Sequence, residues 1–246
     1  MNKNTIQSLW VGPSLSQMEV MCIQSYLSHG HEFHLYTYEN VENVPVGTII
    51  KDANQIIPEK DIYVDAFGGY VNLSNKFRYT LLYKMGGWWV DMDTVCLRHF
   101  DFEEDFVFSS EFSEPYNRYV VNTTFIKSLP GSKYLADCLH FLQSRGYHDM
   151  HWGELGVNLF SRMIFRNNLA AYIKPPHYFC PVSPHELRLL ITKDAFDLTA
   201  NSYALHWWNE IWKRLNLDKN GAFPEGSTYE MMKSKYSTAL VCEKEI

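Results

Sequence analysis

Two aspartates separated by a single residue, Asp91 and Asp93, are the side chains of this sequence best suited to do chemistry. In an extended segment, residues two apart point to the same side, so both carboxylates would face one spot. Two like charges held this close repel each other unless a cation lies beside them. Carboxylate oxygens are hard ligands that suit Mg²⁺ or Mn²⁺. The spacing therefore allows a metal site, although a D-x-D pair also occurs as two solvated carboxylates on a turn.

The residues before the pair predict that it ends a buried strand. Phe77, Leu81 and Met85 recur every four residues, which predicts a helix, and Ser74 is the expected N-cap of that helix. Gly86 and Gly87 then interrupt the helical pattern, and the apolar run Trp88-Trp89-Val90 leads directly into Asp91. The carboxylate pair is thus expected at the carboxyl end of a strand.

The first forty residues predict a strand, a helix and a second strand. An apolar run over residues 6–11 is followed by Ser16 and Glu19, which have the spacing of a capping box. Gly30 is placed to end the helix, and residues 33–38 alternate as a strand does. This βαβ pattern predicts an α/β fold with a mainly parallel sheet, which binds ligands beyond the carboxyl ends of its strands.

The rest of the chain continues as one α/β domain over residues 1–246. Strands are expected at 48–51, 106–109 and 123–126, helices are expected at 133–143 and 155–164, and residues 216–246 form a polar, less patterned tail. No internal repeat, low-complexity tract or linker divides the sequence.

Composition excludes several classes of protein. The formal net charge is -6 and no run of Lys or Arg occurs, which argues against binding to nucleic acid or to an anionic membrane surface. Five scattered cysteines, none in a C-x-x-C pair, indicate neither a zinc site nor a disulfide framework. No stretch of about 20 apolar residues is present. We expect a cytoplasmic protein, at most in peripheral contact with the inner face of a membrane.

Four segments, in order along the chain, resemble a known family. Residues 74–98 resemble the D-x-D region of the family-32 type of glycosyltransferases, which includes bacterial capsule and O-antigen transferases. Related enzymes are the α1,4-galactosyl- and α1,4-N-acetylglucosaminyltransferases and the initiating mannosyltransferases. IQSLWVG at 6–12, WGELG at 152–156 and ALHWWN at 204–209 resemble three further motifs of that family. Four ordered matches are far more specific than the D-x-D pair alone.

This resemblance implies a single GT-A domain that binds its donor with residues 1–100 and its acceptor and metal with residues 101–215. It also implies a UDP-sugar donor, Mn²⁺ or Mg²⁺ as cofactor, and retention of anomeric configuration. A hexose or N-acetylhexosamine would pass to a hydroxyl of an oligosaccharide or lipid-linked glycan, as in the synthesis of capsule or O-antigen. A divalent ion would neutralise the departing diphosphate.

The resemblance also assigns roles to residues around the donor nucleotide and the metal. Trp10 would stack on the nucleobase, and Arg78 would contact the donor phosphate or sugar. Asp91 would reach the ribose, the sugar or a metal-bound water. Asp93 would ligate the metal directly, and the residues that complete its coordination would be His206 and Asn209. Simpler structural roles stay open: the Trp and His side chains also suit a packed core, and the Arg also suits an ion pair.

Three further residues are expected in the sugar or acceptor pocket: Asn75, Asn122 and Glu154. At the position of Asn75 the family often has Asp, so the preference for a donor sugar is open. Val157 replaces a Pro found in many relatives, which changes the start of a helix rather than chemistry.

Two other functions compete with the glycosyltransferase. Asp91-Met92-Asp93-Thr94-Val95 also fits the nucleophile loop of a haloacid-dehalogenase-like, Mg²⁺-dependent phosphatase. That motif normally opens its chain, whereas here about ninety residues precede it, and the acidic residues 103–105 lie too near to supply the second half of a metal site. The third possibility is a non-catalytic sugar-binding module, which has no need of paired carboxylates.

Overall fold

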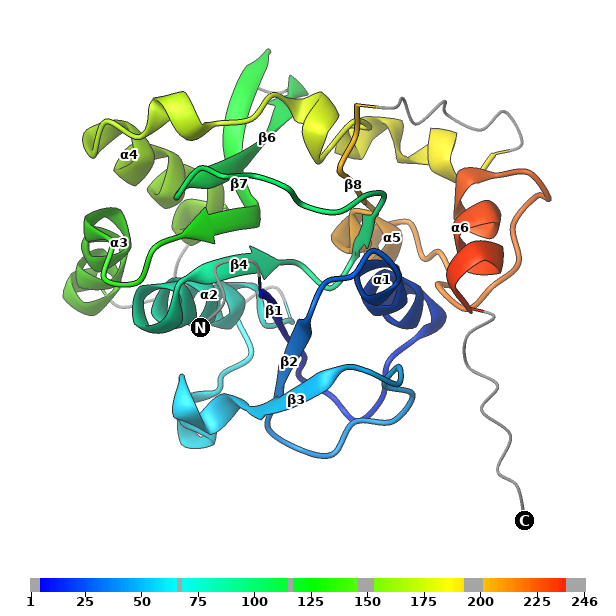
Figure 1. Cartoon of the computed structure of the whole chain (residues 1–246), viewed down its shortest axis with the longest axis horizontal. Coiled ribbons are helices and arrows are strands. Elements are labelled where there is room, and N and C mark those ends of the chain that lie inside the picture. The colour runs from blue at the N-terminus through cyan, green and yellow to red at the C-terminus, as the bar shows by residue number, and fades with distance from the viewer. Residues whose placement is uncertain (1–4, 66–67, 115–116, 146–152, 193–200, 238–246) are drawn as a thin grey trace.

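The computed structural model describes residues 5–65, 68–114, 117–145, 153–192 and 201–237. A six-stranded sheet with the strand order β3-β2-β1-β4-β7-β6 runs through the centre of the fold (Figure 1). The strands are β1 (Ile6–Leu9), β2 (Phe33–Thr37), β3 (Ile49–Asp52), β4 (Gly87–Val90), β6 (Val107–Ser113) and β7 (Arg118–Ser128). Strands β1 to β4 pair in parallel, and β7 is antiparallel to both β4 and β6. The predicted α/β class with a mainly parallel central sheet is confirmed.

Helices cover both faces of this sheet (Figure 1). One core contains side chains of α1 (Gln17–Ser28), α5 (Asn209–Arg214) and α6 (Thr228–Ser237). The other contains side chains of α2 (Val71–Met85), α3 (Lys133–Arg145) and α4 (Leu159–Arg166). The two tryptophans of β4 alternate as strand residues do: Trp88 enters the first core and Trp89 the second. The strand before Asp91 is therefore buried on both faces.

The predicted N-terminal unit is present, and its capping box is formed. At the start of α1, the Ser16 side chain accepts a hydrogen bond from the backbone N–H of Glu19. The Glu19 carboxylate accepts one from the backbone N–H of Ser16. Residues 33–37 form the predicted second strand, and residues 49–52 the third.

The start of α2 differs from the prediction. Ser74 is not the N-cap, because the helix already begins at Val71. The Asp65 carboxylate accepts instead from the backbone N–H groups of Gly69 and Asn72, both at 3.2 Å. A cap supplied from outside the helix leaves no sequence signal at the usual spacing. Ser74 lies within α2, so its hydroxyl can form a hydrogen bond with a neighbouring side chain instead of capping the helix.

The predicted break between α2 and β4 is confirmed and depends on glycine. Gly86 has φ of 65°, and a Cβ there would lie 2.6 Å from Cδ of Pro130. No other residue fits both the backbone conformation and the space.

The helix expected over 155–164 is interrupted. Glu154–Asn158 forms a π-helical turn in which Gly156 has non-helical angles, and α4 follows it. Strand β7 is longer than the four residues predicted, since it pairs with β6 in a hairpin. Trp152 of the WGELG motif lies outside the described residues.

A second, two-stranded sheet joins the C-terminal part of the chain to the D-x-D segment. β5 (Thr94–Cys96) pairs antiparallel with β8 (Ala204–His206), with Thr94 opposite His206. Short 3-10 turns complete the described structure at Ala53–Gln55, Glu59–Asp61, Ala170–Tyr172, Pro176–Tyr178 and Pro184–Leu190. Within the described ranges, no helix is both long and apolar enough to cross a membrane.

Candidate active site

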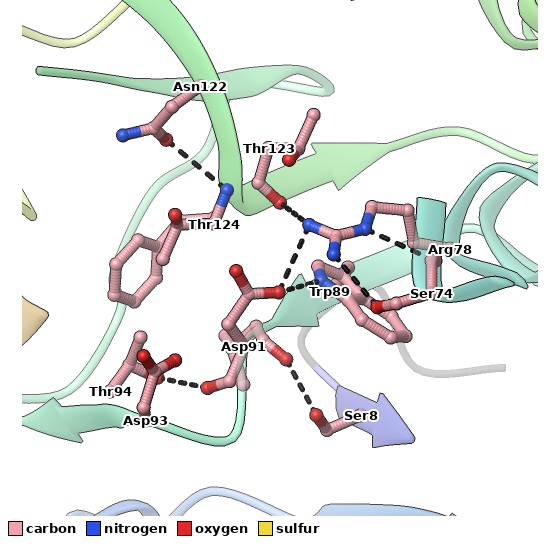
Figure 2. Close-up of polar contacts among 12 residues, drawn as sticks. Ser8, Ser74, Arg78, Trp89, Asp91, Asp93, Thr94, Asn122, Thr123 and Thr124 are labelled. Atoms are coloured by element: carbon pink, nitrogen blue, oxygen red, sulfur yellow. Dashed lines mark hydrogen bonds and ion pairs between the residues drawn. The ribbon is translucent and has the colours of Figure 1, made fainter. Parts of the chain in front are cut away.

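Asp91 lies directly after β4, and the strands on either side of β4 fix its backbone (Figure 2). Its N–H donates to the Thr124 carbonyl of β7 at 3.0 Å. The Ser8 hydroxyl of β1 donates to the Val90 carbonyl at 2.7 Å. The carboxyl end of β4 is thereby held at the middle of the sheet, where α/β folds bind ligands.

The Asp91 carboxylate is oriented by Arg78 and Trp89. Its Oδ1 accepts from the indole Nε1 of Trp89 at 2.9 Å and pairs with Nη1 of Arg78 at 3.0 Å. Arg78 also donates to the Thr123 carbonyl at 2.6 Å and to the Ser74 hydroxyl at 2.8 Å. Figure 2 shows this buried guanidinium between α2, β7 and the aspartate. It contributes positive charge at the cavity wall and fixes the direction of Asp91.

Asp93 is bound by the segment that follows β8. Its Oδ2 lies 3.1 Å from Nε2 of His206 and accepts from the backbone N–H of Asn209 at 2.7 Å. Between these two residues, Trp208 adopts a left-handed conformation with φ of 57°, and its ring lies 3.9 Å from the imidazole. A non-glycine residue in this region is uncommon. Here it turns the chain so that the imidazole and the N–H both reach one carboxylate.

The two aspartates have different electrostatic surroundings. Burial raises the pKa of Asp91, an effect that the Arg78 charge opposes and the Asp93 charge reinforces. Burial would also raise the pKa of Asp93, but the charge and hydrogen bond of His206, together with the Asn209 N–H, outweigh it and lower the pKa to about 2. Burial tends to lower the pKa of His206, yet the Asp93 carboxylate raises it well above 6.5. Strong perturbation of several neighbouring groups is typical of functional sites.

These side chains fit a divalent metal. Among the described residues, Asp91, Asp93 and His206 bring one ligand atom each within 4.8 Å of one another. Two carboxylates and an imidazole form a donor set that suits Mn²⁺, and Mg²⁺ accepts the carboxylates. Asn209 contacts the cluster through its backbone N–H and is one of the residues that line the same cavity.

A cavity of about 570 Å³ opens over the cluster. Its wall brings together eight of the nine residues singled out from the sequence: Trp10, Asn75, Arg78, Asp91, Asp93, Asn122, His206 and Asn209. Glu154 is the exception: Gly153, Gly156 and Val157 of the same segment line the cavity, whereas Glu154 is not part of the wall formed by the described residues.

Trp10 and Asn75 occupy separate parts of this wall. The indole of Trp10 is half-buried, and its Nε1 has no hydrogen-bond partner among the described residues. Asn75 is buried, and its carboxamide packs against Gly156, where a Cβ would lie 3.4 Å from it. The lack of a side chain at Gly156 therefore leaves space for the Asn75 carboxamide beside the cavity.

One acidic residue of the wall was not anticipated from the sequence. Glu111 of β6 lines the cavity and accepts from Nδ2 of Asn122 at 2.7 Å. Its position depends on the β6–β7 hairpin, which pairs Glu111 with Val120. The sequence marks Glu111 only as a charged residue after an apolar strand, so local patterns did not single it out.

A comparison with known protein families shows which class of enzyme this region of the chain is similar to. Residues 17–113, which include α1, α2, β4 and the two aspartates, match the family described as "Glycosyltransferase sugar-binding region containing DXD motif". The match covers less than half of the chain, and it supports a D-x-D glycosyltransferase. The family match favours glycosyl transfer over the phosphatase alternative, because the matched family is one of glycosyltransferases and its matched residues include Asp91 and Asp93.

A solved structure with a TM-score above 0.5 supports the fold described above. The chain is similar to a structure titled "PaToxG Glycosyltransferase", with a TM-score of 0.53 and 12% sequence identity over 95% of this chain and 87% of that chain. A weaker likeness, with a TM-score of 0.44 and 13% identity over 68% of this chain and 86% of that chain, is to a structure titled as a transferase mutant with two cysteine-to-serine changes. No curated protein matches the sequence.

Proposed function

We propose that this glycosyltransferase has a GT-A fold and uses Mn²⁺, or Mg²⁺, to transfer a hexose or N-acetylhexosamine from a UDP-sugar to a hydroxyl of a glycan. We further propose that transfer retains the anomeric configuration and serves the synthesis of a bacterial surface polysaccharide such as capsule or O-antigen. The observation that supports the proposal best is the cluster of Asp91, Asp93 and His206 at the cavity wall.

The donor's parts fit the chemistry of different sections of the cavity wall. The half-buried indole of Trp10 offers a flat apolar surface to a nucleobase. When bound, a divalent ion at Asp93 and His206 supplies positive charge that stabilises the departing diphosphate. Arg78 adds a permanent cation beside Asp91. The sugar would then lie towards Asn75 and Asn122, which line the same cavity.

Retention suits a site in which the leaving phosphate accepts the proton of the attacking hydroxyl on the same face of the sugar. Asp91 and Asp93 are each already held by a cationic or N–H partner, which favours roles in binding and orientation over nucleophilic attack. The D-x-D pair therefore supports same-face attack as the mechanism of this proposal.

The first prediction concerns Asp93. Asp93→Ala removes the carboxylate that binds His206 and Asn209, so we expect the Mn²⁺-dependent affinity for UDP to fall by about a hundredfold or more while the circular dichroism spectrum stays that of the wild type. Isothermal titration of UDP with and without Mn²⁺ measures this. The matched control is Asp61→Asn, an exposed aspartate whose change should leave UDP affinity unaltered.

Two results would argue against the proposal. Normal sugar transfer by the Asp93→Ala variant would show that the cluster does not hold the catalytic metal. Release of phosphate from phosphomonoesters, without any binding of UDP, would instead favour the phosphatase. Slow Mn²⁺-dependent hydrolysis of a UDP-sugar by the wild-type chain would exclude a non-catalytic sugar-binding module.

A further inference from the structure

Glu111 differs from the other carboxylates of the cavity wall in having no Lys or Arg partner among the residues that the structure describes. Glu19 pairs with Lys219, Glu210 with Arg214, Asp91 with Arg78 and Asp93 with His206. Among the described residues, no Lys or Arg forms an ion pair with Glu111, whose hydrogen bond from Asn122 reaches Oε2. Its other oxygen, Oε1, has no hydrogen-bond donor in the described part of the chain.

Asn122 is held in one orientation by its surroundings. Its Oδ1 accepts from the backbone N–H of Thr124 at 3.2 Å and from the Ser109 hydroxyl. Because an N–H can only donate, the amide oxygen must face Thr124, and Nδ2 must face Glu111. The second N–H of the amide points to Sγ of Cys180 at 3.5 Å. Both donors and both lone pairs of this carboxamide are thus used within the protein.

We infer that Glu111 binds a hydroxyl of the transferred sugar and that Asn122 is the residue that positions it. This inference rests on the proposed function, which puts a sugar in the cavity. Glu111 is half-buried, and a bound ligand that displaces water from its carboxylate must supply hydrogen-bond donors in place of that water. Asn122 supplies one donor, and sugar hydroxyls are the donors that a glycosyl donor brings.

The location of Glu111 favours the transferred sugar over the acceptor. Glu111 lines the same cavity as the metal-site residues and interacts electrostatically with Asp91 and His206. Burial raises the pKa of its carboxyl group, with the Asn122 hydrogen bond opposing the change. The sugar attached directly to the diphosphate is the part of the substrate nearest to the metal site. In this arrangement Asn75 and Glu111 contact the sugar directly, and Asn122 does not.

The test compares UDP with a UDP-sugar. UDP-glucose, UDP-galactose and UDP-N-acetylglucosamine are screened with the wild-type chain for Mn²⁺-dependent hydrolysis, and the most rapidly hydrolysed one is titrated. For Glu111→Gln we expect the affinity for UDP to stay within about twofold of the wild type, while affinity for the UDP-sugar falls about ten- to a hundredfold. The control is Glu103→Gln, an exposed glutamate that precedes β6.

A second variant separates binding from structure. Glu111→Gln combined with Asn122→Asp exchanges the two groups: the new amide at position 111 donates to the new carboxylate at position 122, which still accepts from Thr124 and Ser109. In Glu111→Gln, Asn122 occupies the amide oxygen of the new residue and leaves only its NH₂ group for the sugar, whereas in the exchanged variant the amide oxygen is left to accept. We expect the exchanged variant to melt like the wild type and to bind the UDP-sugar more tightly than Glu111→Gln does.

Three results would overturn the inference. The first is an unchanged UDP-sugar affinity in Glu111→Gln. The second is an equal loss of UDP and UDP-sugar affinity, which would indicate a purely structural role. The third is a UDP-sugar affinity in the exchanged variant no higher than that of Glu111→Gln. Failure of the wild-type chain to bind UDP with Mn²⁺ would instead overturn the proposed function, and the inference with it.

Discussion

Arg78 is the residue on which the geometry of the first aspartate depends. It joins α2, β7 and the D-x-D segment through bonds to Ser74, Thr123 and Asp91. The planar guanidinium supplies these donors in fixed directions, whereas a lysine ammonium is a point charge on a flexible stem. Charge alone would therefore not preserve the orientation of the aspartate.

We expect Arg78→Lys to lower kcat/KM for UDP-sugar hydrolysis about ten- to a hundredfold, because the charge is kept but the fork geometry is lost. The control on the same helix is Lys76→Arg, which lies outside the cavity wall and should leave the rate unchanged. Steady-state kinetics measure both variants. An unaltered rate in Arg78→Lys would mean that only the positive charge matters.

At the scale of elements, a pair of stacked histidines joins the loop after α1 to the loop after β5. The rings of His31 and His99 lie 4.2 Å apart and nearly parallel, and Nε2 of His31 accepts from the Phe100 N–H at 3.1 Å. Burial, followed by the charges of His99 and His29, lowers the pKa of His31 from 6.5 to about 4. The folded chain thus requires this imidazole to be neutral.

The sign of the pH dependence follows from this shift. Between pH 6.5 and pH 4 the unfolded chain binds a proton at His31 that the folded chain does not, so stability falls as the pH falls. We expect a loss of about 2 kcal/mol between pH 7.5 and pH 5 from this residue. His31→Gln keeps an acceptor for Phe100 and should remove that loss. Urea unfolding at both pH values measures it, and equal losses in the two proteins would contradict the assignment.

How much of these elements the sequence predicts depends on the range of the interactions. The break at Gly86 and Gly87 and the strand before Asp91 are local features, and both were predicted correctly. The start of α2 was not, since Asp65 caps it from outside the helix.

The contact of Arg78 with the Thr123 carbonyl depends on how β7 pairs with β4, which no local pattern encodes. The same is true of Glu111, whose partner Asn122 lies on the neighbouring strand of a hairpin. The family resemblance predicted that His206 lies near the two aspartates. The distance between its Nε2 and Oδ2 of Asp93, and the left-handed conformation of Trp208, are seen only in the folded structure.

At the scale of the whole molecule, the site is made by joining distant parts of the chain. The central sheet supplies the D-x-D segment at the end of β4, and the pairing of β5 with β8 brings His206 beside Asp93. The β6–β7 hairpin supplies Glu111 to the cavity wall. In the proposed function, the donor nucleotide, the metal and the sugar would each contact a different part of this one fold.

A crystal of the wild-type chain grown with Mn²⁺ and UDP tests the central claim most directly. We predict an anomalous manganese peak in contact with the Asp93 carboxylate, with Nε2 of His206 and with phosphate oxygens of UDP, beside Asp91. UDP bound in the cavity with no ion at these residues, or manganese bound elsewhere, would contradict the account.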